Sequence, residues 1–349
     1  MTETNDPSLP MVTVICPVRN ESGFIARCLR SLLDSDYPAE RMEVLVVDGM
    51  SDDGTRDIVR RIAEADPRVK LLDNPQRIVP TAMNIGIRAA VGDVIVRMDG
   101  HAEVEGDFIS ESVRALREHP GVWAAGGVME TVGTTYAGRV VSAAMSSPVG
   151  VGSGNFRVVS TPGYRYAGPF SAQWRWVFDR AGLFDEELVR NQDDEFIQRV
   201  IAAGGKMYQQ PSIRCRYFAR TSFRKLMSQY YQYGFWRIRT IQKHGQAARF
   251  RQVVPLLFVL GWIGLLAATV VYPPLWPALA GSAGLYVLGL IASIVLAARK
   301  HPLRVAALVP LAVAIMHFAY GLGSLKGIWS WVILRGRFVR RGAAHSMSR

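Results

Sequence analysis

Acidic residues at three places in the sequence have types and spacings suited to chemistry. They are Asp48, Asp99 with the neighbouring His101, and the triplet Asp193, Asp194 and Glu195. A carboxylate together with an imidazole can hold a divalent cation. Adjacent like charges raise the proton affinity of one carboxylate, which is what a general base needs. A carboxylate at a strand end can accept a hydrogen bond from a nucleobase or a ribose. The candidate chemistry is therefore polar recognition, metal binding and proton transfer.

The stretch around Asp99 has the pattern of a buried strand that ends in a turn. Residues 94–96 are β-branched, as a buried strand prefers, and the chain breaks at Asp99 and Gly100. Ligands of open α/β sheets bind beyond the carboxyl ends of the strands. In extended geometry Asp99 and His101 would lie on one face, which favours a shared metal. The alternative is a strand-end turn with a solvated aspartate.

The other two acidic groups also have structural alternatives. Asp48 can equally be a capping or turn aspartate at the end of a strand. The triplet 193–195 opens a helical segment, where the helix dipole stabilises acids without any catalytic role. The sequence therefore leaves both readings open at each position.

Alternating strands and helices would position these residues. Strands are expected over 11–16, 43–47, 69–72 and 94–96, and helices over 24–33, from residue 53 or 55 onward, and over 81–90. We expect Asn20 or Ser22 to cap the first of these helices. The alternation predicts an α/β fold with a parallel sheet and helices on its faces.

The next part of the chain is less regular. A helix is expected over 108–118, a strand over 122–128 and a helix over 192–203. The glycine-rich stretch 149–155 can bring backbone N–H groups close to a phosphate, or it can serve as a mobile linker.

The composition favours a membrane over nucleic acid as the partner. The chain has 349 residues, a net charge of +12 and 49% hydrophobic residues. The hydrophobic excess lies after residue 252 and basic residues cluster beside it, which suits an anionic membrane surface. The three cysteines are far apart, so we expect reduced thiols in a cytosol. Residues 1–10 form a polar leader, and we expect no signal peptide.

Three apolar runs follow this boundary. The runs 253–272 and 275–298 carry no charge and are long enough to cross a bilayer, whereas 303–325 is a weaker third candidate. The basic residues that flank them are Arg249, Arg251, Arg299, Lys300 and Arg304. By the positive-inside rule, the domain before the runs faces the cytoplasm. The basic tail 326–349 conflicts with a third full span, so either the third run re-enters or the tail is an exception.

The segment 221–252 before the runs is basic and aromatic. Its aromatic residues include Tyr230, Tyr231, Tyr233, Phe235 and Trp236, close to Arg237 and Arg239. The segment either meets a polyprenyl-linked acceptor or forms an aromatic belt that anchors the protein.

Five motifs in order resemble those of family 2 glycosyltransferases: Pro17–Glu21, Val46–Gly49 with Asp53–Thr55, Asn84–Gly86, Asp99–His101 and Gln192–Glu195. The resemblance covers residues 11 to about 240 and is greatest to the membrane-associated enzymes of bacterial exopolysaccharide assembly, of the succinoglycan type. It implies a GT-A fold, which is Rossmann-like with a mainly parallel mixed sheet. It also implies a nucleotide-sugar donor, Mg²⁺ or Mn²⁺, and direct displacement with inversion at the anomeric carbon.

The resemblance also implies roles for individual residues. Asp99 would bind the metal that bridges the diphosphate, and Asp193 would deprotonate the acceptor hydroxyl. The nucleoside pocket would be lined by Pro17, Asn20, Glu21 and Asp48, with Asn84 nearby. The acceptor side would include Asp194, Glu195, Gln232 and Trp236.

Several positions depart from the family pattern. Gly49 stands where a second acid is frequent, and Met83 stands where an arginine is usual, so we assign Arg77 to supply that charge. His101 replaces the second aspartate of the metal motif, which leaves one hard anionic ligand. Phe235 replaces the arginine of a motif found in processive synthases, and we therefore predict a single sugar addition.

We predict a membrane-bound inverting hexosyltransferase that adds one sugar, from a donor expected to be UDP-linked, to a polyprenyl-linked glycan in exopolysaccharide or cell-surface polysaccharide synthesis. The alternatives are a polyprenyl-phosphate sugar synthase and an inactive nucleotide-sugar-binding membrane protein. The turn at 17–20 lacks the glycine fingerprint of dinucleotide oxidoreductases. The apolar runs hold His317 but no acid, which argues against a transporter.

The expected organisation follows from these assignments. A leader (1–10) precedes a catalytic domain (11–220), interfacial helices (221–252), a membrane region (253–325) and a basic tail (326–349). We expect the protein in the inner membrane with its catalytic domain facing the cytoplasm. We also expect association with other polysaccharide-assembly enzymes and no nucleic-acid partner.

Overall fold

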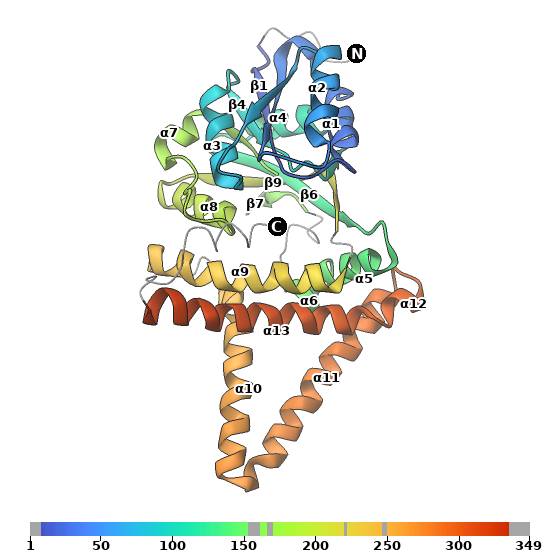
Figure 1. Cartoon of the computed structure of the whole chain (residues 1–349), viewed down its shortest axis with the longest axis vertical. Coiled ribbons are helices and arrows are strands. Elements are labelled where there is room, and N and C mark those ends of the chain that lie inside the picture. Colours follow the sequence, from blue (N-terminus) through green and yellow to red (C-terminus); the bar gives the residue numbers. More distant parts are fainter. Residues whose placement is uncertain (1–7, 153–160, 166–169, 220–221, 246–249, 335–349) are drawn as a thin grey trace. The chain divides into compact units, whose positions relative to one another are not determined.

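A computed structural model of the chain describes residues 8–152, 161–165, 170–219, 222–245 and 250–334 (Figure 1). The chain forms two compact units. Unit 1 comprises Met1–Glu130 and Val159–Tyr217, and unit 2 comprises Thr131–Val158 and Phe218–Met347. Most of the expected leader, the end of the glycine-rich stretch and most of the basic tail lie outside the described residues.

Unit 1 is organised by a sheet that has nine strands in the described part of the chain, in the order β3-β2-β1-β4-β8-β6-β9-β5, with β7 paired to β9. The strands are β1 (Val12–Val18), β2 (Met42–Asp48), β3 (Val69–Asp73), β4 (Val94–Arg97), β5 (Ala102–Val104), β6 (Val122–Val132), β7 (Gly163–Tyr164), β8 (Ala172–Trp174) and β9 (Lys206–Phe218). Strands β1 to β4 are parallel, whereas β8 runs antiparallel to β4 and β6. The predicted parallel α/β sheet is therefore confirmed, with an antiparallel half added to it.

The strands form where the sequence supplies continuous apolar runs. Every residue of β1, β2 and β4 is buried, which is the pattern of a parallel sheet covered on both faces. The sequence indicates the strand at β6 but not β5, β7 or β8. Each of these has two or three residues, too few to show a period.

Six helices of unit 1 flank this sheet within the described residues: α1 (Ile25–Leu33), α2 (Thr55–Ala65), α3 (Val79–Ala89), α4 (Phe108–Glu118), α7 (Trp176–Ala181) and α8 (Gln192–Ala202). The prediction that Asn20 or Ser22 caps the first helix is wrong, because its N-cap is Phe24 without a side-chain bond. Asn20 instead exchanges hydrogen bonds with Asp52. Helix α2 begins at Thr55, one of its two predicted starts.

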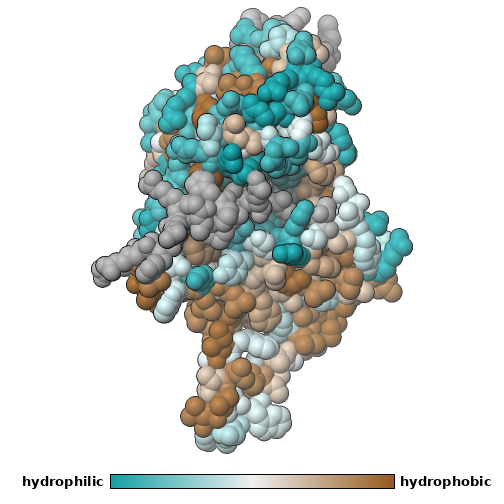
Figure 2. Space-filling model, in the orientation of Figure 1, coloured by the Kyte–Doolittle hydropathy of each residue, from teal (hydrophilic) through white to brown (hydrophobic). Residues whose placement is uncertain are grey.

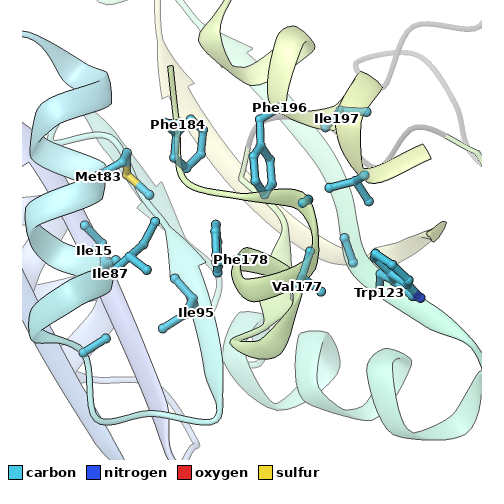
Figure 3. Close-up of a cluster of buried hydrophobic side chains, with 14 of the residues drawn as sticks. Ile15, Met83, Ile87, Ile95, Trp123, Val177, Phe178, Phe184, Phe196 and Ile197 are labelled. Carbon is cyan, nitrogen blue, oxygen red and sulfur yellow. The ribbon is translucent and has the colours of Figure 1, made fainter. Parts of the chain in front are cut away.

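One hydrophobic core fixes the elements that carry the acidic residues. Ile15 of β1 and Ile95 of β4 pack with Met83 of α3, and three phenylalanines close the cluster (Figure 3). The ring of Phe196 stacks on Phe184 at 4.7 Å and on Phe178 at 5.2 Å between centroids. This stack anchors α8, and with it the acidic triplet at the start of that helix.

Unit 2 is helical in its described residues. Its helices are α5 (Tyr136–Met145), α6 (Pro148–Val151), α9 (Phe223–His244), α10 (Val254–Val271), α11 (Trp276–Ala298), α12 (Leu303–Ala306) and α13 (Val309–Gly327), followed by a π-helical segment, η4 (Ile328–Ile333). Helices α10 and α11 form a hairpin, and α9 and α13 lie side by side across the open end of this hairpin (Figure 1). The third apolar run is broken between α12, which ends at Ala306, and α13, which begins at Val309.

Glycines allow α9 and α13 to approach closely. A Cβ on Gly234 of α9 would collide with the carbonyl oxygen of Tyr320, and one on Gly323 of α13 would collide with that of Tyr231. Small residues at such contacts are how apolar helices pack without a large side-chain layer. Arg237 adds a hydrogen bond from Nε to the Tyr320 hydroxyl at 3.3 Å.

Within the described parts of the chain, three helical segments are long and apolar enough to cross a membrane: Val254–Val271, Pro273–Ala298 and Leu303–Ile333. The first two leave their apolar side chains on the surface, which is brown along the hairpin in Figure 2. Only 11% and 6% of their most apolar windows are buried, against 44% for the third segment. The third segment is thus partly enclosed by protein.

Candidate active site

The carboxyl ends of β1, β2 and β4 bring two of the predicted site regions to one edge of the sheet. Strand β1 pairs with β2 through Val18 and Asp48, and with β4 through Ile15 and Arg97. Asp48 is the last residue of β2, and Asp99 follows β4 by two residues. Parallel strands end at the same side of a sheet, where ligands bind in open α/β folds.

Asp48 is buried and holds a turn together. Its carboxylate accepts hydrogen bonds from the Ser51 backbone N–H at 2.9 Å and from the Ser51 hydroxyl at 2.6 Å. Arg56 donates to the same group at 2.9 Å and to Asp73 at 2.7 Å. The carboxylate thus has the partners that a buried charge requires, and the turn role anticipated as an alternative is present.

The loops after β1 and β2 are tied to each other around Asn20. The Asn20 amide group donates to Asp52 at 2.9 Å and its side-chain oxygen accepts from the Asp52 N–H at 3.0 Å. Asp53 accepts from the backbone N–H groups of Ser22 and Thr55. Burial opposes its charge, but these bonds and that from the Thr55 hydroxyl lower the pKa of Asp53 to about 2. Pro17 lies in β1, one residue before the end of that strand.

Arginines lie beside Gly49 in the same region. A Cβ on Gly49 would stand 3.3 Å from the Arg19 Cβ and 3.4 Å from the Arg77 Cα, so an acid there would crowd both. Arg77 is exposed and has a positive φ of 62°. The exposed guanidinium provides a cation at the edge where the sequence places the donor.

The side chain of Asn84 bonds to a distant loop of unit 1. It is 2% exposed, and its side chain bonds the backbone O and N of Phe184, both at 2.9 Å, and the Glu186 carboxylate at 2.8 Å. In the described structure these bonds fix the loop before α8, one hundred residues further along the chain. Asn84 therefore positions the helix that carries Asp193.

Arg97 is a residue that the motif analysis missed. It is the last residue of β4, its side chain is 9% exposed, and its Nε and Nη2 donate to Asp99 Oδ1 at 3.1 and 2.9 Å. Its Nη1 donates to Asp193 Oδ1. One guanidinium thus joins the predicted metal ligand to the predicted base. The available signal was a charged residue at the end of an otherwise apolar strand, two positions before Asp99.

The environment of Asp193 suits a general base. Burial is the largest effect, and it raises the pKa of Asp193 to about 6 although Arg97 acts in the opposite direction. The charges of Asp99 and Asp194 add to the increase. The predicted repulsion between like charges therefore contributes to the raised pKa, but desolvation of the carboxylate is the larger cause. A carboxylate with this pKa is largely ionised at neutral pH and is a stronger base than a solvated one.

The other two members of the triplet have different surroundings. Glu195 is 3% exposed and makes a two-pronged ion pair with Arg199 at 2.8 and 2.9 Å. Arg199 also donates to the carbonyl oxygens of Ala181 and Leu183, so this pair supports the loop before α8. Asp194 is half-buried in the first turn of the same helix.

His101 lies in a pocket made by two other elements. Its Nδ1 is 2.8 Å from the Glu21 carboxylate, and its ring meets that of Tyr217 edge-on at 4.9 Å. The stretch from Asp99 to Ala102 is a turn, with the Ala102 N–H donating to the Asp99 carbonyl oxygen at 3.0 Å. The extended geometry assumed in the sequence argument is therefore absent here.

The described residues contain no group of three or more His, Cys, Asp or Glu side chains placed to hold a metal ion, but two donor atoms at this turn are available to one. His101 Nε2 is buried without a hydrogen-bond partner, and Asp99 Oδ2 has none among the described residues. Glu21 on the opposite ring nitrogen is the carboxylate–histidine pairing that orients metal-binding imidazoles. Burial disfavours the charged ring, but Tyr217, Glu21 and Asp99 outweigh it and raise the pKa of His101 to about 10. Nε2 therefore carries a proton until a cation replaces it.

Gln232 and Trp236 belong to α9 of unit 2. The Gln232 amide group donates to the Ser228 hydroxyl at 3.2 Å. Trp236 is 1% exposed and packs on Phe235 and Trp331, each at 5.5 Å between ring centroids. Trp236 thus contributes to the interior of unit 2 rather than to an exposed aromatic belt.

Known proteins are similar to this chain in sequence and in fold. The model of the family described as "Glycosyl transferase family 2" matches residues 13–180. The succinoglycan biosynthesis protein ExoA of Rhizobium meliloti (strain 1021) is 30% identical over 260 residues, which cover 74% of this chain and 78% of that protein. A Methanococcus voltae protein is 28% identical over 236 residues, covering 64% and 71% of the two chains. It is named dolichyl N-acetyl-alpha-D-glucosaminyl phosphate 3-beta-D-2,3-diacetamido-2,3-dideoxy-beta-D-glucuronosyltransferase.

The fold resembles that of a solved transferase. The mannosyltransferase PcManGT from Pyrobaculum calidifontis, in complex with GDP-Man and Mn²⁺, superposes with a TM-score of 0.63 at 21% identity. The match covers 93% of this chain and 88% of that protein. The predicted GT-A-like fold, followed by long apolar helices, is confirmed by this likeness.

Proposed function

Because the chain belongs to glycosyltransferase family 2, we propose that it transfers one sugar from a nucleotide-sugar donor to a hydroxyl of a polyprenyl-linked glycan, with inversion at the anomeric carbon. The reaction would serve exopolysaccharide or cell-surface polysaccharide synthesis. The observation that carries the proposal is the single guanidinium that joins Asp99 to Asp193 at the carboxyl edge of the sheet.

On the donor side, the proposal assigns the loops after β1 and β2 to the nucleoside. Pro17, Asn20 and Asp48 shape these loops, and Arg77 offers a cation to the diphosphate. Asp99 Oδ2 and His101 Nε2 would hold Mg²⁺ or Mn²⁺, with Glu21 orienting the imidazole. The cation, when bound, offsets the charge that develops on the departing nucleoside diphosphate. A UDP-linked donor is the first one to test.

On the acceptor side, Asp193 takes the proton of the acceptor hydroxyl. The freed oxygen lone pair forms the new bond to the anomeric carbon as the bond to the nucleoside diphosphate breaks, and the leaving group carries away the negative charge. One displacement inverts the anomeric configuration. Asp194 would face the acceptor beside Asp193, and Glu195 would hold the helix start through Arg199.

The proposal places α9 at the lipid end of the acceptor. Gln232 would contact the acceptor, and Trp236 would support α9 through its packing on Trp331. Support for a lipid-linked acceptor comes from the name of the Methanococcus voltae relative, which specifies a dolichyl-linked substrate. The replacement of an arginine by Phe235 supports a single addition.

We also propose how the protein lies in a membrane. Helices α10 and α11 would cross as a hairpin, while α9 and α13 would lie along the cytoplasmic surface with the catalytic unit on that side. The burial of the third apolar segment supports this arrangement. The basic residues Arg299, Lys300 and Arg304 after α11 support the same orientation. An even number of crossings also returns the basic tail to the cytoplasm.

The test is a donor screen with the full chain in membranes. UDP- and GDP-linked sugars would be offered with a lipid-linked acceptor extract, with and without Mn²⁺ or Mg²⁺, and transfer of labelled sugar to lipid would be followed. We expect transfer from one donor and its loss when EDTA removes the cation. Donor binding without any transfer to lipid would support the inactive binding protein instead.

A further inference from the structure

Arg97 stands out as a buried cation that no motif accounts for. It ends β4, where the preceding residues Val94, Ile95 and Val96 are apolar and buried. Burying a guanidinium is costly unless carboxylates pair with it, and removing one partner of such a group is strongly destabilising. The position therefore needs a reason beyond strand formation.

The geometry of the guanidinium supplies one. Nε and Nη2 both point to Asp99 Oδ1, and Nη1 points to Asp193. A planar guanidinium presents its donors at fixed angles, so its two carboxylate partners are held in a fixed relation. Asp99 and Asp193 come from different elements, ninety-four residues apart in the sequence, and this side chain joins them.

Asp193 depends on this contact for its orientation. In the described part of the chain, Arg97 is its hydrogen-bond partner, and the N-cap residue of α8, Asn191, makes no side-chain cap bond. A cavity beside the carboxylate is lined mainly by apolar and aromatic side chains, among them Met83, Phe178 and Phe184. Besides Arg97 and Asp193, its polar lining residues are Ser171 and Gln173, and the Gln173 amide group donates to the Ser171 hydroxyl at 3.2 Å. Asp99 and Asp194 repel the Asp193 carboxylate.

We propose that Arg97 is a positioning residue that sets the distance and direction of the base Asp193 relative to the donor end of the site at Asp99. This inference rests on the proposed transfer reaction. Because Arg97 engages Oδ1 of Asp99, Oδ2 stays available to the donor side. Arg97 acts through Asp193 and does not touch the reacting atoms.

Positioning makes a specific prediction for kinetics. Misplacing a base slows the chemical step and leaves donor affinity nearly unchanged. We expect Arg97→Met to lower kcat by about 100-fold while KM for the donor and Kd for the nucleoside diphosphate with Mn²⁺ change by less than about threefold. Arg97→Lys keeps the charge but loses the planar donor set, and it should recover about a tenth of the wild-type kcat.

A double-mutant cycle separates positioning from general stability. If Arg97 works through Asp193, Arg97→Met in an Asp193→Asn background should lower kcat by less than about threefold. The matched control is Arg68→Met. Arg68 is 19% exposed, pairs with Asp66 at 2.7 Å, and should leave kcat unchanged in both backgrounds.

The outcomes are distinguishable. The positioning role would be overturned by a kcat within threefold of wild type for Arg97→Met. It would also be overturned if the effects of Arg97→Met and Asp193→Asn on kcat were fully additive. In both cases transfer by the wild-type chain would still support the proposed function. If Arg97→Met does not fold, the cycle is run with Arg97→Lys, for which additivity has the same meaning. If the wild-type chain transfers no sugar at all, the proposed function fails first and the inference falls with it.

Discussion

At the scale of single residues, the proposed donor end of the site pairs the Asp99 carboxylate with the His101 imidazole, where the family pattern has two carboxylates. Glu21 lies against one nitrogen of His101, and the other nitrogen has no hydrogen-bond partner among the described residues. One carboxylate with one imidazole favours Mn²⁺ over Mg²⁺, because Mg²⁺ prefers oxygen ligands throughout. Under the proposal, Glu21 would act on the metal side in addition to the nucleoside loop.

Replacing Glu21 tests this assignment. Glu21→Gln should weaken Mn²⁺ binding in the presence of a nucleoside diphosphate by about 10- to 100-fold, because the imidazole loses its orienting carboxylate. The measurement is the electron paramagnetic resonance signal of free Mn²⁺ in a titration. Glu40→Gln, at an exposed position, is the control and should bind like wild type. Equal Mn²⁺ affinity for Glu21→Gln and wild type would rule out the orienting role.

The pH dependence of transfer reports on Asp193. The base must be ionised, and its pKa is raised to about 6. If Asp193 is the base, we expect low activity below pH 6, where it is protonated, and a rise to a plateau as the pH passes above it. The measurement is kcat/KM for the donor between pH 5 and pH 8. A profile that is flat across this range would exclude a base with this pKa.

How much of the site the sequence predicted can be stated residue by residue. The sequence singles out Asp48, Asp99 and Asp193 because acids at strand ends and helix starts follow a local pattern, and their roles stay predictions. Arg97 was missed because its two partners come from separate elements, which no local spacing reveals. The bonds of Asn84 to the loop before α8 were invisible for the same reason.

At the scale of elements, local patterns predicted the parallel strands and the helices between them. These elements have apolar runs or helical spacing long enough to show a period. The short antiparallel strands β5, β7 and β8 exist because longer neighbours pair with them, so their residues carry little local signal. The break between α12 and α13 was likewise hidden within an apolar run.

The contact between α9 and α13 depends on glycine. Gly323→Leu should lower the melting temperature of the full chain in detergent, because the side chain would meet the Tyr231 carbonyl oxygen. Such overpacking costs about 1–3 kcal/mol. Gly264→Leu in α10 is the matched control, since no atom lies within 4 Å of an added Cβ there. Equal melting temperatures for the two variants would show that the contact tolerates a side chain.

At the scale of the whole molecule, the apolar helices raise the question of how often the chain crosses the bilayer. Length and composition allow three crossings. The packing of α13 along α9 favours two, because a helix enclosed on one side by another helix has less surface to offer lipid. Two crossings also agree with a basic tail on the cytoplasmic side.

Reporter fusions can count the crossings. A phosphatase reporter, active only outside the cytoplasm, should be active in the loop at Pro273 and inactive after Leu334, because two crossings bring the chain back. A fluorescent reporter that matures in the cytoplasm should give the opposite pattern. An active phosphatase after Leu334 would indicate that α13 crosses the bilayer as a third span.

The central claim is that this enzyme adds a single sugar with Asp193 as its base. The most direct measurement is the mass of the lipid-linked product formed by the wild-type chain and by Asp193→Asn, with the donor that the screen identifies. We predict a product heavier by one sugar for wild type, and a loss of at least about 100-fold in its rate for Asp193→Asn. A ladder of longer products would contradict single addition, and full activity of Asp193→Asn would contradict the base and favour a polyprenyl phosphate as the acceptor.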